Sequence, residues 1–149
     1  MSRGGESVRR SLAVSAVLAV AAALPLAGCG GGSREWPGPP RPAADGTVSV
    51  AGFSHAARSP IDTAAAFLRL DKRQAATTTL VSKTALEGGD RAAVTATFDG
   101  LLDDSIRADR YVLLLERQSD GTWRLRSATW SQRCWSGRGH QNFSVALCV

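Results

Sequence analysis

The chain has 149 residues, and its 18 lysine and arginine residues outnumber its 13 aspartate and glutamate residues, which gives a formal net charge of +5. Three basic residues and one acidic residue lie in the first 28 positions. The remaining residues therefore include 15 basic and 12 acidic ones, which gives a net charge of about +3. No basic run and no basic helix interleaved with aromatic residues is present, so a nucleic-acid partner is not expected. After the N-terminal segments, about a hundred residues remain, which is enough for one domain and too few for two.

The first 28 residues have the layout of a secretory signal. Three arginines near the start are followed by an apolar run over residues 12–26. This run is shorter than the roughly 20 residues that a helix needs to cross a bilayer, so a removable signal is expected. The pair Arg9-Arg10 resembles a twin-arginine export signal. A plain positively charged start is the interpretation that we favour, because the residues around the pair match that pattern only in part.

The residues Leu26-Ala27-Gly28-Cys29 close this signal and resemble the lipobox of bacterial lipoproteins. The resemblance implies that the Cys29 Sγ takes a diacylglyceryl group, and that cleavage after Gly28 makes Cys29 the new N-terminus. Fatty acyl chains such as palmitate would then hold the protein on the extracytoplasmic face of the cell membrane, because two or more chains bind a bilayer stably. Ordinary signal cleavage beside an unmodified cysteine is the alternative.

We predict three regions in the chain. They are a lipoprotein signal peptide at residues 1–28, the lipidated cysteine with a Gly/Pro-rich linker at 29–45, and a single extracytoplasmic domain at 46–149. The linker composition indicates a spacer, and its segment WPGPPRP also has the P-x-x-P spacing of ligands for proline-binding modules. The excess of arginine over lysine and the abundance of alanine are typical of a G+C-rich bacterium such as an actinobacterium.

One amphipathic helix is predicted at the start of the domain. Ser59 suits the N-cap and Pro60 suits the first helical position. The spacing of Ile61, Ala65 and Leu68, with Ala64 and Phe67 beside them, then predicts an apolar face that packs on a flat element.

Four strands are predicted after the helix. Two strands that meet at Gly88-Gly89 are indicated by alternating apolar residues in TTTLVSKTALEGGDRAAVTATFDG. Two more, joined by a tight turn at Asp120-Gly121, are indicated by SIRADRYVLLLERQ and TWRLRSATWSQRCW. The earlier stretch TVSVAGF adds a short edge strand or lies against the helix. The expected fold class is α+β, with one N-terminal helix packed on a curled antiparallel four-stranded meander and with a C-terminal disulfide loop.

This order of elements resembles the cystatin-like cone of the nuclear-transport-factor-two superfamily. The closing segment DGTWRLRSATWSQRCWSGRGHQNFSVALCV is also similar to the ends of uncharacterised actinobacterial lipoproteins. The resemblance implies a cone-shaped sheet with a pocket on its concave side. The chain offers one long helix where the enzymes of that superfamily have more, which implies a shallow or open pocket. The superfamily contains both enzymes and binding modules, so the fold alone does not supply a function.

Cys134 and Cys148 remain once Cys29 is assigned to the lipid. Outside the cytoplasm an even pair most simply forms a disulfide, and the 15-residue ring would contribute about 3 kcal/mol by loop entropy. A zinc site that includes His140 is a second interpretation, but the ligand spacing fits structural zinc sites poorly. A Cys–His nucleophile is a third, and it needs a free thiolate. We expect the disulfide, with no metal and no cofactor.

Four aromatic residues on or after the predicted strands are candidates for ligand binding. They are Tyr111, Trp123, Trp130 and Trp135. Packing in the core and at its rim is the simpler role for all four, and a stacking platform for sugars or lipids is the alternative.

Two functions of different classes fit the sequence. The first is a non-catalytic binding or interaction module, held at the membrane by its lipid and recognising an envelope protein, a cell-wall component or a small ligand. The second is an envelope enzyme of the isomerase or hydrolase type, in which Asp103 or Asp104 acts with His55 or His140 in the sheet cone. The first is favoured because no aligned catalytic set is visible. An acid and a histidine within hydrogen-bond distance inside one pocket would favour the enzyme.

Overall fold

The computed structural model describes residues 35–84 and 89–149. The predictions for the signal peptide, for Cys29 and for the beginning of the linker lie outside the described residues. Residues Arg34–Val149 belong to one compact unit, which contains the described core and both cysteines of the disulfide. Among the described residues, no helix is both long and apolar enough to cross a membrane.

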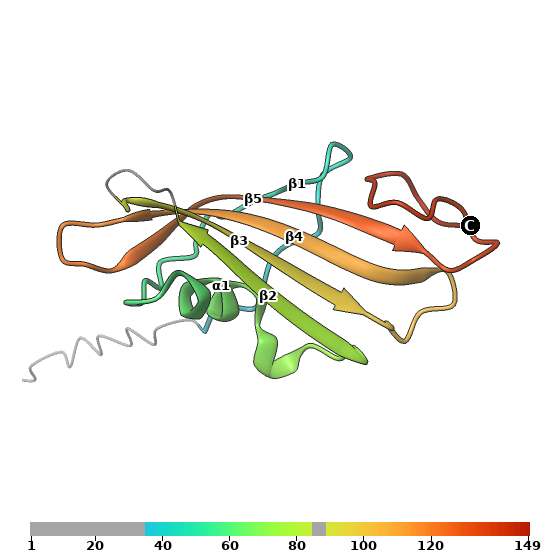
Figure 1. Cartoon of the computed structure of the whole chain (residues 1–149), viewed down its shortest axis with the longest axis horizontal. Coiled ribbons are helices and arrows are strands. Elements are labelled where there is room, and N and C mark those ends of the chain that lie inside the picture. Colours follow the sequence, from blue (N-terminus) through green and yellow to red (C-terminus); the bar gives the residue numbers. More distant parts are fainter. Residues whose placement is uncertain (1–34, 85–88) are drawn as a thin grey trace, which may run out of the picture. The chain divides into compact units, whose positions relative to one another are not determined.

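The architecture is one helix on one antiparallel sheet, which confirms the α+β fold class (Figure 1). The helix α1 spans Pro60–Leu68 and is followed by a short 3-10 helix, η1, at Leu70–Lys72. The strands run in the order β1-β5-β4-β3-β2 and have the bounds Thr47–Val48 (β1), Thr77–Thr84 (β2), Arg91–Asp99 (β3), Ile106–Arg117 (β4) and Trp123–Cys134 (β5).

The sheet has five strands, so the predicted count of four is wrong. The additional strand is β1, whose residues Thr47 and Val48 pair with Thr129 and Ala128 of β5. Two residues are too few to show a repeat of alternating burial, so the sequence could not separate this strand from a segment lying on the helix. The β2-β3-β4-β5 meander is otherwise as predicted.

Helix α1 begins where its sequence predicts. The Ser59 Oγ accepts a hydrogen bond from the amide of Asp62 at 3.5 Å, and Pro60 opens the first turn. The helix ends at Arg69, which adopts the left-handed conformation with φ 53°. The buried face agrees with the predicted one at Ala64, Phe67 and Leu68 and differs from it at Ile61, which is 38% exposed. The residues that are buried are Thr63, Ala64, Phe67 and Leu68.

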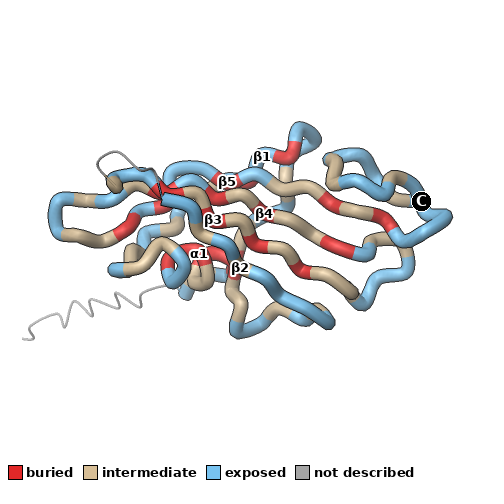
Figure 2. The backbone as a smooth tube through the Cα atoms, viewed as in Figure 1, coloured by how far each residue is buried: buried red, intermediate tan, exposed pale blue. Residues whose placement is uncertain are grey.

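The core lies between α1 and the sheet face that it covers, which we call the inner face (Figure 2). Burial alternates along β3, where Ala92, Val94, Ala96 and Phe98 are buried and the residues between them are not. This two-residue period is that of a sheet with one covered face. We call the opposite side the outer face.

The segment before β1 also contributes to the core. Trp36 stacks on Phe67 with ring centroids 5.5 Å apart, and its indole N–H donates to the Phe67 carbonyl at 2.8 Å. Phe53 meets both rings edge-on, at 5.2 Å from each. Residues that we assigned to the linker therefore pack on the helix, and the folded unit starts nearer the N-terminus than residue 46.

The C-terminal loop is closed by a disulfide between Cys134 and Cys148, as predicted, with an S–S distance of 2.08 Å. Cys134 is the last residue of β5 and is fully buried. The returning tail adds a backbone bridge between Ser144 and Gln132, and the Gln132 side-chain amide donates to the Ala146 carbonyl at 2.6 Å. The disulfide thus ties the tail to the end of the sheet.

Candidate functional site

The four predicted aromatic residues do not form one platform. Trp123 is buried at the start of β5, where its amide donates to the Ala57 carbonyl at 2.7 Å. Tyr111 and Trp130 are paired neighbours on the inner face of β4 and β5. Trp135 lies beyond β5, and its indole N–H donates to the Asp103 carbonyl at 2.8 Å. The structure therefore brings together only Tyr111 and Trp130.

These two residues belong to a polar cluster on the inner face. The Trp130 indole N–H donates to the Asp109 carboxylate at 2.9 Å, and the guanidinium of Arg73 lies 3.6 Å from the other carboxylate oxygen. Arg73 also donates to the Tyr111 hydroxyl at 2.8 Å and stacks over the Tyr111 ring at 4.8 Å. Burial raises the pKa of Asp109 and of Tyr111 above the ordinary values of these groups. Neither Asp109 nor Arg73 was singled out from the sequence.

This cluster has the properties of a structural network. Each carboxylate oxygen of Asp109 faces a donor, and the Tyr111 hydroxyl has its own partner in Arg73. A buried polar group that is satisfied in this way fixes the geometry around it. The Asp109 carboxyl, with its raised pKa, keeps its proton to higher pH, as a general acid does. The enzyme alternative also requires a histidine beside the acid, and no histidine contacts Asp109.

The acids and histidines that we considered for catalysis lie apart. Asp103 accepts backbone hydrogen bonds from Ser105 at 2.8 Å and Ile106 at 2.6 Å, which lower its pKa. The two ring nitrogens of His140 face the carbonyls of Asn142 at 2.7 Å and Ala146 at 2.9 Å. No histidine in residues 35–84 or 89–149 makes a hydrogen bond or an ion pair with a carboxylate.

The alternative zinc ligands do lie close together. Ligand atoms of Cys134, His140 and Cys148 are all within 4.8 Å of one another. However, both sulfur atoms are joined in the disulfide, and a thiolate is the form that binds zinc. In the oxidised protein Cys134 and Cys148 therefore close the loop covalently, and His140 lies beside this bond without being part of it.

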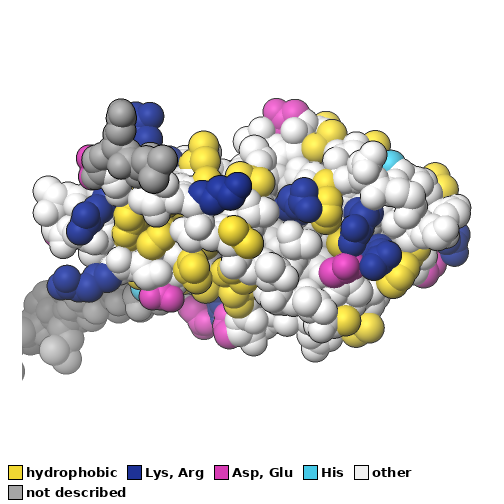
Figure 3. Space-filling view, viewed as in Figure 1, with side chains coloured by type: hydrophobic (Ala, Val, Ile, Leu, Met, Phe, Trp, Pro, Cys, Tyr) yellow, Lys and Arg dark blue, Asp and Glu magenta, His cyan; other side chains and the backbone are white. Residues whose placement is uncertain are grey.

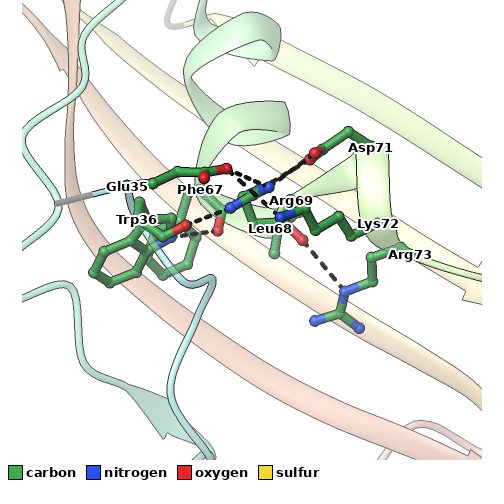
Figure 4. A network of polar contacts seen from close by, with 8 residues as sticks. All are labelled: Glu35, Trp36, Phe67, Leu68, Arg69, Asp71, Lys72 and Arg73. Atoms are coloured by element: carbon green, nitrogen blue, oxygen red, sulfur yellow. Dashed lines mark hydrogen bonds and ion pairs between the residues drawn. The ribbon is translucent and has the colours of Figure 1, made fainter. Parts of the chain in front are cut away.

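A hollow of about 360 Å³ lies beside the C-terminal end of α1, and His55 is on its lining. Its two acids are held by one guanidinium, since Arg69 pairs with Glu35 at 2.8 Å and with Asp71 at 2.9 Å (Figure 4). Arg69 also donates to the Trp36 carbonyl at 2.6 Å. The hydrogen bond from Arg69 lowers the pKa of Asp71. Both acids are thus engaged in fastening the N-terminal segment to the helix.

A larger groove, of about 510 Å³, lies on the outer face of the sheet. Its floor is apolar and follows one row of paired residues across four strands, from Lys83 through Ala93 and Leu114 to Ser127. The volume is within the range of roughly 300–1,000 Å³ that small-molecule sites occupy. The described residues that line it are Lys83, Thr84, Arg91, Ala92, Ala93, Leu114, Leu115, Glu116, Arg126 and Ser127.

A β-bulge accompanies this groove. Leu114 pairs with Ser127 and Leu115 pairs with Leu125, so Arg126 is an extra residue on β5. A bulge bends its strand and increases the local twist, and so changes the directions in which neighbouring side chains point. Ala93 contributes only a methyl group beside Leu114, which leaves space between strands β2 and β4. Leu114 is 50% exposed as a result, although it is a large apolar residue.

The rim of the groove is basic. Lys83, Arg91 and Arg126 line it, and among the described lining residues the one carboxylate is that of Glu116. Glu116 is engaged by the guanidinium of Arg126, so its charge is neutralised locally. The site therefore combines an apolar floor with an excess of positive charge.

Sequence reasoning missed this groove. The one signal for it was the triplet Leu113-Leu114-Leu115, which necessarily directs an apolar side chain to each face of a strand. The position of the bulge has no such signal, because it depends on pairing with β5. Comparisons of the chain with protein-family models, with curated proteins and with solved structures found no match. Function is therefore inferred from the geometry of the chain itself.

Proposed function

We propose that the protein is a non-catalytic binding module, held by a lipid on the extracytoplasmic face of the cell membrane, and that the outer-face groove binds an apolar ligand. The groove is the observation that carries the proposal. It exposes Leu114 beside Ala93 in a space large enough for a small molecule. A hollow with an apolar floor and a few polar groups at its edge is the usual form of a ligand site.

The cystatin-like resemblance is part of the same proposal. A single helix on one face of an antiparallel meander supports it. The resemblance implied a pocket on the concave side of the sheet, and in this chain the face that α1 covers is filled by the core. The groove lies on the opposite face, so we propose a cystatin-like scaffold that uses its outer face for binding.

The lipid anchor is supported by the lipobox residues and by the oxidised cysteine pair. A structural disulfide is typical of proteins outside the cytoplasm, where a lipobox signal would deliver the chain. Cys29→Ser removes the sulfur that would carry the lipid. In cells fed a labelled fatty acid, we expect label in the wild-type protein and none in the variant, together with uncleaved or mis-cleaved precursor. Label that persists in the variant would refute this site.

The enzyme alternative requires an acid and a histidine that act together. The described residues supply no such pair, since Asp103 is engaged by backbone amides and His140 by backbone carbonyls. We expect that replacing Asp103, Asp104, His55 or His140 singly with alanine abolishes no turnover. A turnover that one of these changes removes would overturn the non-catalytic proposal.

Binding in the groove can be tested with Nile red, a neutral apolar dye that becomes fluorescent in apolar surroundings. The chain Arg34–Val149 is suitable because it contains the described core and the disulfide. Leu114→Asp places a charge on the groove floor at a half-exposed position, and should weaken dye binding at least tenfold. Leu102→Asp is the matched control, because Leu102 is 88% exposed and lies outside the groove. Equal effects of the two variants, or no saturable dye binding, would contradict the proposal.

A further inference from the structure

We propose that the ligand of the outer-face groove is an amphiphile with one alkyl chain and an anionic headgroup. This inference rests on the proposed function, because it specifies the chemistry of the molecule that the same groove binds. An alkyl chain suits the floor formed by Ala93 and Leu114, and a carboxylate or phosphate suits the cations at the rim. A free fatty acid would supply this chemistry.

Two cations at the rim are available for such a headgroup. Lys83 faces the groove from β2 and Arg91 from β3, and neither forms an ion pair with a described residue. Arg126 is paired with Glu116 and therefore neutralises the acid that would otherwise repel an anion. An arginine and a lysine together can bind a planar carboxylate or a phosphate through charge-assisted hydrogen bonds.

The whole outer face reinforces this charge preference. Strands β2 to β5 direct seven basic side chains to it and two acidic ones, for a difference of +5. Lys and Arg side chains recur along the surface that Figure 3 presents, with hydrophobic side chains between them. The basic residues are Lys83, Arg91, Arg107, Arg110, Arg124, Arg126 and Arg133, and the acidic residues are Asp99 and Glu116.

Part of this charge has no local counterpart. Asp99 pairs with Arg107 at 3.1 Å and with Arg133 at 3.0 Å. Arg110 stacks on the Phe143 ring at 3.7 Å and makes no ion pair with a described residue, and its buried Nε has no hydrogen-bond partner. A surface with an excess of one charge attracts ligands of the opposite charge and raises their rate of association.

The groove geometry favours an amphiphile over other anions. Four strands at about 4.8 Å spacing give the row from Lys83 to Ser127 a span of about 14 Å, most of it floored by apolar or small side chains. A small inorganic anion would leave this floor in contact with water. Single-stranded nucleic acid would need aromatic residues on which bases stack, and none is among the described residues that line the groove.

Calorimetric titration of Arg34–Val149 tests the inference with three probes that share a twelve-carbon chain. They are dodecanoate, neutral dodecyl maltoside and dodecyltrimethylammonium, each below its micelle-forming concentration. We expect dodecanoate to bind at least tenfold more tightly than the neutral probe at low salt, and the cationic probe to bind most weakly. The advantage of dodecanoate should shrink at high salt, because screening weakens exposed charge pairs.

The double variant Lys83→Gln/Arg91→Gln removes the headgroup contacts and leaves the floor intact. Each cation near an anionic head contributes about fivefold, so dodecanoate should bind about 25-fold more weakly while the neutral probe is unaffected. Arg124→Gln is the matched control, since Arg124 is an exposed cation on the same face outside the groove lining, and we expect its effect to stay within twofold.

The outcomes separate this inference from the proposed function. Neutral and anionic probes that bind equally, or an advantage that survives in the double variant, would overturn the headgroup assignment and leave the groove in place. No binding of any probe would overturn the proposed function itself.

Flotation with phosphatidylcholine vesicles that contain 30% phosphatidylglycerol then identifies the source of the ligand. Flotation would show that the groove takes a two-chain membrane lipid and would contradict the assignment of a single-chain ligand, whereas its absence alongside dodecanoate binding would support a free fatty acid.

Discussion

The carboxyl group of Asp109 lies among aromatic side chains on the inner face of β4, with 16% of its side chain exposed. Removal from water favours the neutral form of an acid, and this effect outweighs the indole N–H of Trp130 and the charge of Arg73. The folded state therefore binds the Asp109 proton more tightly than the unfolded state does. This contribution to stability is complete below the ordinary pKa of about 3.8 and is lost as the pH rises through the higher folded value.

Asp109→Asn should reveal this contribution, because asparagine keeps an acceptor for the Trp130 indole and does not ionise. We expect the variant to gain stability relative to the wild type between pH 3.5 and pH 7, as measured by the urea midpoint. The same comparison for exposed Asp104→Asn is the control. A variant that instead loses stability relative to the wild type over this range would show that the ion pair with Arg73 dominates.

A second residue-scale prediction concerns Gly46, which has φ 82° and passes close to β5. A Cβ at this position would lie 2.6 Å from the Trp130 carbonyl oxygen and 2.6 Å from a Val145 methyl group. Gly121 has the same φ and nothing within 4 Å of its Cβ position. Gly121→Ala therefore reports only the free-energy cost of placing alanine at a positive φ.

We expect Gly121→Ala to cost about 1 kcal/mol of unfolding free energy and Gly46→Ala to cost roughly 1–3 kcal/mol more, because the second also forces β1 away from β5. Chemical denaturation of both variants measures the difference. Equal losses would mean that the tail and β1 yield to the added methyl group at no cost.

At the scale of the elements, the helix start and the meander could be predicted from local signals. Ser59 and Pro60 define a helix N-terminus chemically, and the alternation of Ala92, Val94, Ala96 and Phe98 requires a half-covered strand. For the two-residue strand β1 the sequence left an edge strand and a segment on the helix as equal alternatives, because β1 exists only through its pairing with β5. The groove could not be predicted for the same reason, since its bulge depends on the register between β4 and β5.

The predicted helix face shows how tertiary context decides among several apolar positions. Helical spacing favoured Ile61 as a buried residue, but Thr63 is buried in its place. The Thr63 hydroxyl donates to the Trp123 carbonyl at 3.0 Å and accepts from the Ala57 amide at 3.0 Å. These two bonds connect the helix to β5 and to the chain before it, and neither partner can be identified from the sequence.

The C-terminal loop is the element for which removal of one bond has the clearest expected effect. The Cys134→Ala/Cys148→Ala variant loses the closure of the tail on β5, and we expect about 2–5 kcal/mol of lost unfolding free energy. The Ser144–Gln132 bridge and the Phe143 stacking on Arg110 remain to hold the tail in place. Urea denaturation under oxidising and reducing conditions measures the loss. An unchanged midpoint would mean that these contacts hold the tail without the covalent bond.

At the scale of the whole molecule, the sheet separates two environments. The inner face carries the core and a satisfied polar cluster, whereas the outer face carries the groove and an excess of arginine and lysine. The sequence suggested charges that were evenly mixed, and only the register of the strands reveals that they are gathered on one side. The groove places binding on the outer face, and this one-sided distribution of charge favours an anionic ligand there.

Chemical-shift mapping of the backbone amides tests the placement of the site most directly. On titration of ¹⁵N-labelled Arg34–Val149 with dodecanoate, we expect saturable shifts that are largest around Ala93, Leu114 and Ser127, with little change at Asp109 and Trp130. Shifts that are largest at the inner-face cluster, or shifts spread over the surface without saturation, would contradict a binding site in the outer-face groove.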